Sequence, residues 1–334
     1  MFKLKAPYLL FLGDAADQLA AKTAQGIVDW RPDACLGQLK LDTCNADLGI
    51  PNLTLSEGVS KGAKTLIIGV ANRGGVISAS WEKVFIEALE LGFDLASGLH
   101  NKLHDIPKIV RSAESHQRNL FDVRHPSGSF SVGTGAKRKG NRLLPVGTDC
   151  SIGKMYTALA IERELTGRGI AATFRATGQT GIFIAGEGVS VDAVISDFIS
   201  GAVEALAPEN NEDHWDIIEG QGSLFHPSYA GVTAGLIHGS QPDALVLCHE
   251  PTRTHMRGLP HYPIPSLDQC MKLSLDVAKL TNSEARFVGI AVNTAALDEG
   301  RAEQYLNETS DKFKLPCVDP VRTGVAPIIN QFVI

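Results

Sequence analysis

The sequence predicts an α/β protein of two domains, each built mainly on parallel β-sheet. Short apolar runs alternate with amphipathic segments along the whole chain, which is the pattern of strands connected by helices. With 334 residues, 44% of them hydrophobic, the chain can form two hydrophobic cores. Pro, Gly, Ser and charged residues gather between residues 125 and 140, a composition typical of a linker. We therefore expect one domain at residues 1–135 and a second at residues 136–334.

In the first domain, three apolar runs have the length and flanking residues of buried strands. We expect these strands at residues 8–13, 64–70 and 119–123, and amphipathic helices at residues 17–29, 79–91 and 107–117. The first strand ends in Gly13-Asp14 without a G-x-G-x-x-G motif, so we do not expect a bound dinucleotide there.

The second domain repeats the alternation of apolar runs and amphipathic segments. Strands are expected at residues 142–147, 171–176, 215–219, 244–248 and 287–292. Helices are expected at residues 154–166, 191–205, 267–280 and 298–309. No internal repeat or low-complexity tract interrupts this pattern.

Composition limits the classes of partner. The net charge of −6 argues against general binding to nucleic acid or to an anionic membrane, and no apolar run has membrane-spanning length. The short apolar run near the N-terminus is followed at once by acidic residues, so it predicts a strand rather than a signal peptide. Six cysteines lack paired or metal-finger spacing, which favours reduced thiols in a cytoplasmic protein: Cys35, Cys44, Cys150, Cys248, Cys270 and Cys317. We expect a small-molecule substrate.

The most specific motif is a predicted phosphate-binding loop. An apolar strand leads into a glycine-bounded loop, then Gly-Lys and a helix, a pattern that surrounds a phosphate with backbone N–H groups and one ammonium. The predicted binding residues are Gly147, Thr148, Asp149, Cys150, Ser151, Ile152, Gly153, Lys154 and Met155.

Met155 occupies the position at which nucleotide-hydrolysing loops carry Ser or Thr. That hydroxyl is a ligand of Mg²⁺, and a thioether is a poor ligand for a hard cation. Thr157 lies two residues further on, where it points to another side of the helix. The loop is one residue longer than G-x-x-x-x-G-K-[ST], and this spacing is similar to that of dethiobiotin synthetase and its ATP-using relatives. The sequence thus predicts phosphate binding, and predicts ATP only weakly.

Further polar residues follow predicted strands of the second domain. Glu219 ends one strand before a Gly-rich turn, at the sheet edge where Lys154 is expected; it could accept a proton, or only cap the strand or pair with the lysine. His226 also follows a strand end. Asn293 could pair with adenine, as an Asn does in similar synthetases, or form a turn. Cys248 and His249 are adjacent on a strand and point to opposite faces, so they cannot form a dyad directly.

Two other groups of residues have weaker signals. Asn72 and Arg73 follow a buried strand of the first domain, and a guanidinium fork can bind both oxygens of a substrate carboxylate. The basic run at residues 137–139 could meet the additional ribose phosphate of coenzyme A, or could be a solvated linker.

Four segments together resemble a bacterial family that includes the D-glutamate N-acetyltransferases: residues 147–155, 219–223, 248–251 and 71–75. The resemblance covers nearly the whole chain, and its most specific mark is the Gly-Lys-Met variant of the loop. It implies a Rossmann-like N-terminal domain and a P-loop C-terminal domain, an acyltransferase activity, and acetyl-CoA as co-substrate with no required metal.

The resemblance also implies roles for the candidate residues. Lys154 and the loop N–H groups would anchor the phosphates of acetyl-CoA, with Asn293 at its adenine. Arg73 and Asn72 would hold the substrate carboxylate, and Glu219 or His226 would remove a proton from the attacking ammonium group. Two alternatives stay open, an ATP-dependent ligase or kinase resembling dethiobiotin synthetase, and a non-catalytic coenzyme sensor. A homodimer is expected by analogy with P-loop relatives.

Overall fold

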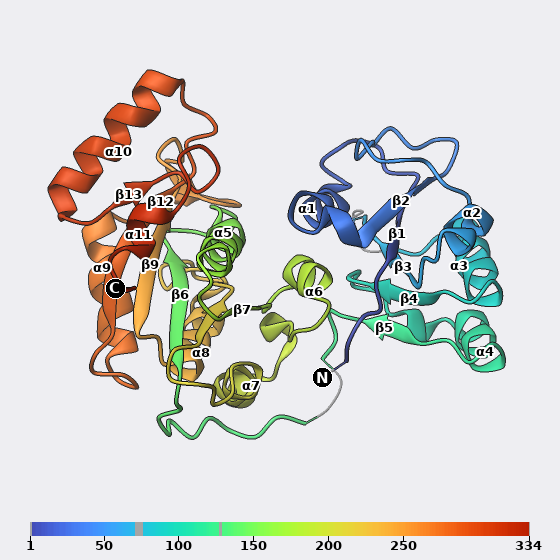
Figure 1. The fold of residues 1–334 in the computed structure, drawn as a ribbon, viewed down its shortest axis with the longest axis horizontal. Helices are drawn as coiled ribbons and strands as arrows, with labels where there is room; N and C mark the ends of the chain where they lie inside the picture. The colour runs from blue at the N-terminus through green and yellow to red at the C-terminus, as the bar shows by residue number, and fades with distance from the viewer. Residues whose placement is uncertain (1, 71–75, 127–128, 334) are drawn as a thin grey trace. The chain divides into compact units, whose positions relative to one another are not determined.

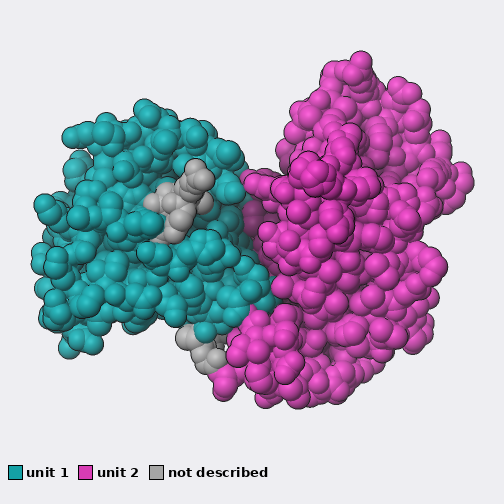
Figure 2. All heavy atoms as spheres, turned by 180° about the vertical axis from the view of Figure 1, so that it is seen from behind, with its two compact units in different colours: residues 1–128, 178–193 teal, residues 129–177, 194–334 magenta. Residues whose placement is uncertain are grey.

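The computed structural model describes residues 2–70, 76–126 and 129–333, and it divides the chain into two compact units. Unit 1 consists of residues 1–128 and 178–193, and unit 2 of residues 129–177 and 194–334 (Figure 2). Both units are α/β structures with parallel sheets, as the sequence predicts. The first crossing of the chain, at residues 128–129, falls inside the expected linker. The second unit-1 segment lies within the part of the sequence that we assigned to the second domain.

Unit 1 is built on a five-stranded parallel sheet with the strand order β2-β1-β3-β4-β5 (Figure 1). Its strands are β1 (Tyr8–Gly13), β2 (Cys35–Lys40), β3 (Thr65–Ile68), β4 (Asp94–Ser97) and β5 (Leu120–Asp122). Its helices are α1 (Lys22–Trp30), α2 (Leu55–Ser60), α3 (Ala79–Glu90), α4 (Pro107–Ser115) and α6 (Gln179–Ala185), with short 3₁₀ turns η1 (Pro32–Ala34), η3 (Leu103–Asp105) and η4 (Val191–Ala193).

The core of unit 1 forms where β1 meets α3. All six residues of β1 are buried, and the Phe11 ring packs edge-on against Trp81 and Phe85 at centroid distances of 5.3 and 5.1 Å. The Trp81 indole N–H donates to Asp14 over 2.9 Å. Gly13 has a φ of +52°, and a Cβ there would lie 2.7 Å from the indole. Only glycine therefore lets the strand turn beneath this ring.

The segment at residues 178–193 packs on unit 1 through its own hydrogen bonds. Leu4 N–H donates to the Gly186 carbonyl over 2.7 Å, and the Ser190 hydroxyl donates to the Val123 carbonyl over 3.0 Å. The expected helix at 191–205 is consequently shorter. The structure has 3₁₀ turns up to Phe198, and helix α7 begins only at Ile199 because the chain returns to unit 2 in between.

Unit 2 contains a six-stranded, all-parallel sheet with the strand order β13-β12-β9-β6-β8-β7. Its strands are β6 (Asn141–Gly147), β7 (Ala172–Arg175), β8 (Trp215–Ile218), β9 (Ala244–His249), β12 (Arg286–Val292) and β13 (Cys317–Val318). A separate antiparallel hairpin consists of β10 (His255–Met256) and β11 (Leu259–Pro263). The helices are α5 (Lys154–Gly167), α7 (Ile199–Leu206), α8 (Ala230–Ser240), α9 (Leu267–Ala278), α10 (Glu299–Phe313) and α11 (Ala326–Ile329), with a 3₁₀ turn η5 (Ser196–Phe198).

Helices cover the central strands of this sheet. Helix α5 contacts β6, β7 and β8, whereas α9 contacts β9 and β12 (Figure 1). Helix α8, which the sequence did not predict, packs on α7 through its glycines. A Cβ at Gly239 would lie 2.3 Å from the Ser200 carbonyl oxygen, and one at Gly235 would lie 2.7 Å from the Ile199 side chain. These glycines weaken the helix signal in the sequence, and they also allow the close approach of the two helices. In the part of the chain that the structure describes, no helix is long and apolar enough to cross a membrane.

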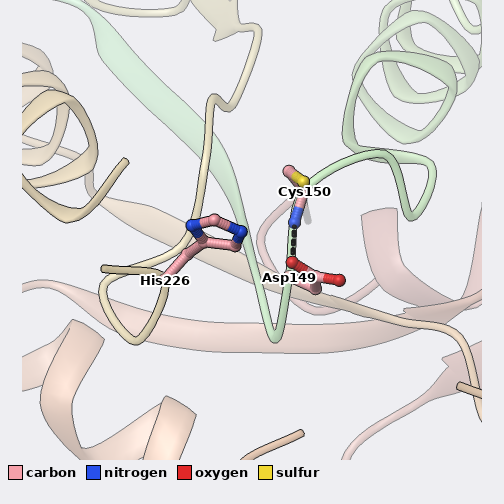
Figure 3. Close-up of side chains that lie close together, drawn as sticks. All are labelled: Asp149, Cys150 and His226. Atoms are coloured by element: carbon pink, nitrogen blue, oxygen red, sulfur yellow. Dashed lines mark hydrogen bonds between the residues drawn. The ribbon is translucent and has the colours of Figure 1, made fainter. Parts of the chain in front are cut away.

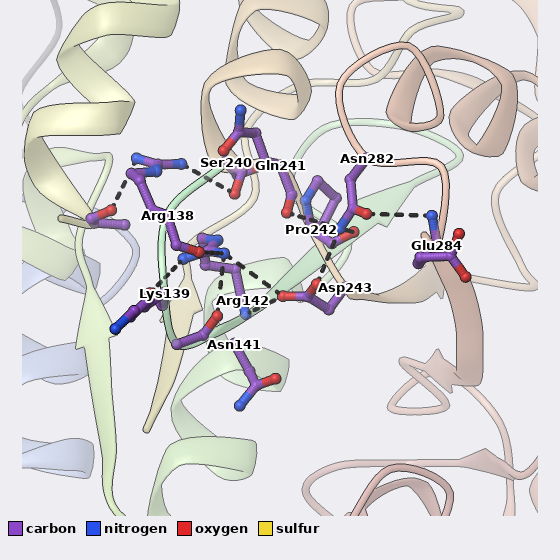
Figure 4. Close-up of polar contacts among 12 residues, drawn as sticks. Arg138, Lys139, Asn141, Arg142, Ser240, Gln241, Pro242, Asp243, Asn282 and Glu284 are labelled. Carbon is purple, nitrogen blue, oxygen red and sulfur yellow. Dashed lines mark hydrogen bonds and ion pairs between the residues drawn. The ribbon is translucent and has the colours of Figure 1, made fainter. Parts of the chain in front are cut away.

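Arg138 of the basic run connects the ends of α7 and α8 (Figure 4). Its guanidinium donates to the carbonyls of Glu204 and Ala207 over 2.9 and 2.8 Å, and to those of Gly239 and Ser240 over 2.6 and 3.4 Å. Burial, with the neighbouring charge of Arg142, lowers the pKa of Arg138 to about 10, so the cation persists at neutral pH. Neither the coenzyme role nor the solvated linker that we considered fits this residue. It caps two helix C-termini.

Arg142 continues this network inside the fold. Its guanidinium is 1% exposed and donates to the carbonyls of Arg138, Lys139 and Gly140 (Figure 4). The Asp243 carboxylate accepts the Arg142 backbone N–H over 2.9 Å and lies 3.9 Å from its guanidinium. The linker thus enters β6 in one fixed register.

Arg138→Met should lower the free energy of unfolding by about 2–4 kcal/mol, because four carbonyl oxygens lose a charged donor. Urea denaturation followed by circular dichroism measures this change. Lys139→Met is the matched control, since the Lys139 side chain is exposed and makes no bond to a described residue. Equal stability of the two variants would show that Arg138 does not connect the helices.

Candidate functional site

The candidate residues of unit 2 gather at the carboxyl edge of its sheet. Gly147 ends β6, Glu219 follows β8, His249 ends β9 and Asn293 follows β12. Because all six strands are parallel, their carboxyl ends meet at one edge, where ligands bind in sheets of this kind.

The loop at this edge has the backbone of an anion site. Ser151 has a φ of +53° and Gly153 a φ of +106°, so left-handed residues interrupt the chain just before α5. The N–H groups of residues 151–155 donate to no acceptor among the described residues. Successive free N–H groups at a helix N-terminus form a concave site with positive potential.

Lys154 is folded back over this loop. The side chain is 5% exposed, and its ammonium donates to the Asp149 carbonyl over 2.7 Å. Burial lowers the pKa of Lys154 below its usual value. Gly220 lies directly beside it: a Cβ there would be 1.8 Å from the Pro145 carbonyl oxygen and 3.0 Å from the Lys154 side chain. The turn after Glu219 therefore needs glycine to reach the lysine.

The helix after Lys154 offers no hydroxyl at the position of a metal ligand. Met155 is half-buried, and the Thr157 hydroxyl donates to the Gly153 carbonyl over 3.0 Å within the helix. The Cys248 thiol also contacts the Thr157 hydroxyl, at 3.4 Å. The Thr157 hydroxyl thus bonds within helix α5 and to strand β9.

Asp149 is fully buried in the phosphate loop and joins the loop to the β10–β11 hairpin. Its carboxylate accepts the backbone N–H of Cys150 over 2.7 Å, the guanidinium of Arg253 over 2.7 Å and the backbone N–H of Arg257 over 2.8 Å. Burial alone would raise the pKa of Asp149, but these donors outweigh it and the pKa is lowered. The loop therefore contains a charged carboxylate with a direct counterion.

Arg253 makes contacts along the phosphate loop. Besides Asp149, its guanidinium donates to the carbonyls of Cys150 and Ser151 over 2.8 and 3.3 Å and to the Glu250 carboxylate over 2.6 Å. We did not identify Arg253 or Arg257 from the sequence. Both lie about a hundred residues after the loop, so only a basic pair in a Pro- and Gly-rich segment could have indicated them.

Asp149, Cys150 and His226 come together within 4.8 Å (Figure 3). The His226 Nδ1 accepts the Ser228 N–H over 3.2 Å, which leaves the proton on Nε2, 3.3 Å from the Arg257 carbonyl. Burial and the adjacent Asp149 raise the pKa of the Cys150 thiol. Asp149 already accepts its three donors. A metal ion would have to displace these partners beside a guanidinium, so the donor set does not fit one.

Glu219 is held by the chain that follows β7. It is 4% exposed; its Oε2 accepts the Thr177 backbone N–H over 2.9 Å, and its carbonyl accepts the Thr177 hydroxyl over 2.7 Å. The turn beyond Glu219 is connected to the phosphate loop, because the Ser223 hydroxyl donates to the Thr148 carbonyl over 3.2 Å. The turn that follows Glu219 is therefore hydrogen-bonded to the phosphate loop.

His249 and Asn293 take different positions at the edge. The His249 Nδ1 lies 3.0 Å from the Thr148 hydroxyl, its ring stacks on Tyr305, and burial lowers its pKa to about 4. Asn293 is exposed, and its side-chain oxygen accepts the Ala295 N–H over 3.1 Å, which is an Asx turn.

The predicted residues Asn72 and Arg73 lie outside the described residues.

An anion loop with a lysine at the edge of a parallel sheet, following a parallel α/β unit, defines a P-loop protein with a Rossmann-like partner domain. The family models agree, matching the DUF1611 Rossmann-like domain at residues 37–126 and its P-loop domain at residues 130–329. A crystal structure of a DUF1611 family protein from Anabaena variabilis has a TM-score of 0.85 and 33% identity, covering 98% of this chain and 99% of that one.

Two curated relatives are similar over nearly their whole length. A D-glutamate N-acetyltransferase from Tritonibacter scottomollicae is 58% identical, and one from a Pseudoalteromonas species is 50% identical, each over 327 residues and 98% of both chains. The chain belongs to the DUF1611 family, and its similarity to these two relatives confirms the resemblance predicted from the sequence.

The buried His249 should make the protein less stable in acid. With a pKa of about 4 in the fold and about 6.5 when unfolded, the unfolded state binds more protons between these pH values. The contribution of His249 to the free energy of unfolding is therefore fully present above pH 6.5. It decreases by about 3 kcal/mol in total as the pH falls toward 4. Urea denaturation of His249→Gln across this range should show a correspondingly weaker pH dependence than that of the wild type.

The control is His261→Gln, which removes an exposed histidine of the same unit. Its pH dependence should match the wild type. Parallel curves for His249→Gln and the wild type would contradict the pKa assigned to His249.

Proposed function

We propose that this protein transfers the acetyl group of acetyl-CoA to the amino group of D-glutamate. One observation carries the proposal: the phosphate loop offers free N–H groups and Lys154, with Met155 in place of the Mg²⁺ ligand. Such a loop can hold phosphates that are not themselves transferred. The similarity to two D-glutamate N-acetyltransferases over 98% of the chain supports this substrate and this reaction.

The coenzyme would bind by its phosphates. The N–H groups of residues 151–155 donate to the phosphate oxygens. The Lys154 ammonium gives up its hydrogen bond to the Asp149 carbonyl and donates to a phosphate oxygen instead. The adenine lies at Asn293, whose side-chain amide nitrogen has no acceptor among the described residues. No metal is required, because donors of the protein supply the positive charge in its place.

Glu219 is the better candidate for the general base. The ammonium group of D-glutamate must lose a proton before its nitrogen can attack the thioester carbon, and a buried carboxylate at the sheet edge can accept that proton. His226 has no lone pair available for this role in the described arrangement, since Nδ1 accepts from Ser228 and Nε2 carries the proton.

The reaction then passes through a tetrahedral oxyanion. The N–H groups of residues 220–223 have no acceptor among the described residues, and they can donate to this oxygen, an effect worth about 3–4 kcal/mol for one good donor. Collapse breaks the C–S bond, the attacking nitrogen gives up its second proton to form the neutral amide, and the coenzyme leaves as a thiolate that takes up one proton. The product is N-acetyl-D-glutamate.

Other parts of the proposal rest on the sequence. Asn72 and Arg73 would bind a carboxylate of D-glutamate. The absence of disulfides among the six cysteines is compatible with a cytoplasmic location, and a homodimer remains a prediction from P-loop relatives.

The proposal is tested by thiol release from acetyl-CoA with a panel of D- and L-amino acids, in EDTA and in Mg²⁺. We expect release with D-glutamate, equal in both conditions. If no amino acid in the panel caused thiol release, the proposed acetyltransferase activity would be contradicted. Mg²⁺-dependent hydrolysis of ATP would favour the ligase or kinase alternative.

Glu219→Gln should lower kcat by about 10²–10⁴-fold, because the amide cannot accept the proton. Its side-chain oxygen can still accept the Thr177 N–H, so the coenzyme A Kd from calorimetry should stay that of the wild type. A loss of kcat in His226→Gln with full activity in Glu219→Gln would instead assign the base to His226.

A further inference from the structure

The β10–β11 hairpin presents a second arginine at the phosphate loop. The backbone of Arg257 is fixed at two points, its N–H donating to Asp149 over 2.8 Å and its carbonyl lying 3.3 Å from the His226 Nε2. Both partners belong to the residues that surround Cys150 in the loop (Figure 3). The backbone of Arg257 is therefore held beside the phosphate loop.

The two arginines of this segment differ in what they bind. The guanidinium of Arg253 is engaged by Asp149, Glu250 and two loop carbonyls. The Arg257 side chain is exposed, and its guanidinium bonds to no residue in the described ranges. Arg253 thus serves the loop itself, whereas Arg257 has its donors available for a ligand.

Charge balance leads to the same residue. Arg253 is shared by the Asp149 and Glu250 carboxylates, so among the described residues the loop cations that are not ion-paired are Lys154 and Arg257. The charge of Arg257 reaches the loop, because it acts to lower the pKa of the Cys150 thiol against the larger effect of burial. A diphosphate bound without Mg²⁺ needs more than one cation, since the metal is otherwise its main counter-charge.

We propose that the Arg257 guanidinium binds the diphosphate of the coenzyme opposite Lys154, in the place of the metal ion that Met155 cannot hold. This rests on the proposed use of acetyl-CoA. A planar guanidinium can donate two parallel hydrogen bonds to one phosphate, which an ammonium cannot.

The test compares Arg257→Ala with the wild type on three acetyl donors. With acetyl-CoA, KM should rise by about tenfold or more while kcat changes little, because the contact is made to a group that does not react. Acetyl-dephospho-CoA keeps the diphosphate, so it should show the same loss. S-acetylpantetheine has no phosphate, and on this donor the two proteins should have the same kcat/KM.

Arg257→Lys should recover part of the affinity. Lys279→Ala, which removes an exposed charge at the C-terminal end of α9, is the control and should behave as wild type. An equal KM for Arg257→Ala and wild type on acetyl-CoA, a loss that persists on S-acetylpantetheine, or a loss absent from acetyl-dephospho-CoA would each overturn the proposal.

Calorimetry with coenzyme A separates this inference from the proposed function. If the wild type binds coenzyme A but transfers no acetyl group, the proposed function fails, and the Kd of Arg257→Ala still tests the contact. If the wild type transfers acetyl groups and Arg257→Ala binds coenzyme A equally well, only the contact fails. An unchanged melting temperature of Arg257→Ala would show that its fold is intact.

Discussion

The geometry of the phosphate loop depends on the buried Asp149 carboxylate. An anion in a loop built to bind anions would oppose its ligand, and it is tolerated because Arg253 neutralises it at 2.7 Å. Breaking such a buried pair costs about 3–5 kcal/mol, since the remaining charge has lost its partner. The pair joins the loop after β6 to the segment after β9, which are neighbouring strands. The N–H groups and Lys154 are thereby held in place before any phosphate binds.

The loop and the reacting groups have separate tasks. In an acetyl transfer the phosphates of the coenzyme do not react, so contacts to them contribute equally to the ground state and the transition state. The rate must come from groups near the thioester, for which we propose Glu219 and the N–H groups of the turn that follows it. Gly220 lets this turn approach Lys154, and Ser223 bonds to Thr148, so the two groups of residues are fixed to each other.

Local patterns in the sequence predicted those elements whose signal is itself local. Strand β1 has its predicted bounds, and the predicted ranges for β6, β9 and β12 differ from the observed ones by a single residue, because long apolar runs identify buried parallel strands. Strand β4 was missed, since it has four residues and includes the buried Asp94, which accepts the Asn119 N–H. Helix α8 was not predicted because its glycines, which allow α7 to pack closely, have low helix propensity.

The same distinction applies to the site. The nine loop residues are contiguous and could be recognised together, whereas Arg253 and Arg257 reach the loop only through the order of β6 and β9 in the sheet. Arg138 was misinterpreted for the same reason: in the sequence it is one of three basic residues, and only the fold shows that it binds carbonyls at the ends of two helices.

Chain connectivity adds a constraint on the proposed base. Thr177, whose N–H fixes one carboxylate oxygen of Glu219, is the last residue before the chain passes into unit 1 at residue 178. The direction of this oxygen is therefore set by backbone at a crossing between the units. The segment that follows Thr177 is anchored in unit 1 by hydrogen bonds of Gly186 and Ser190. A residue at such a crossing can orient the carboxylate without touching a substrate.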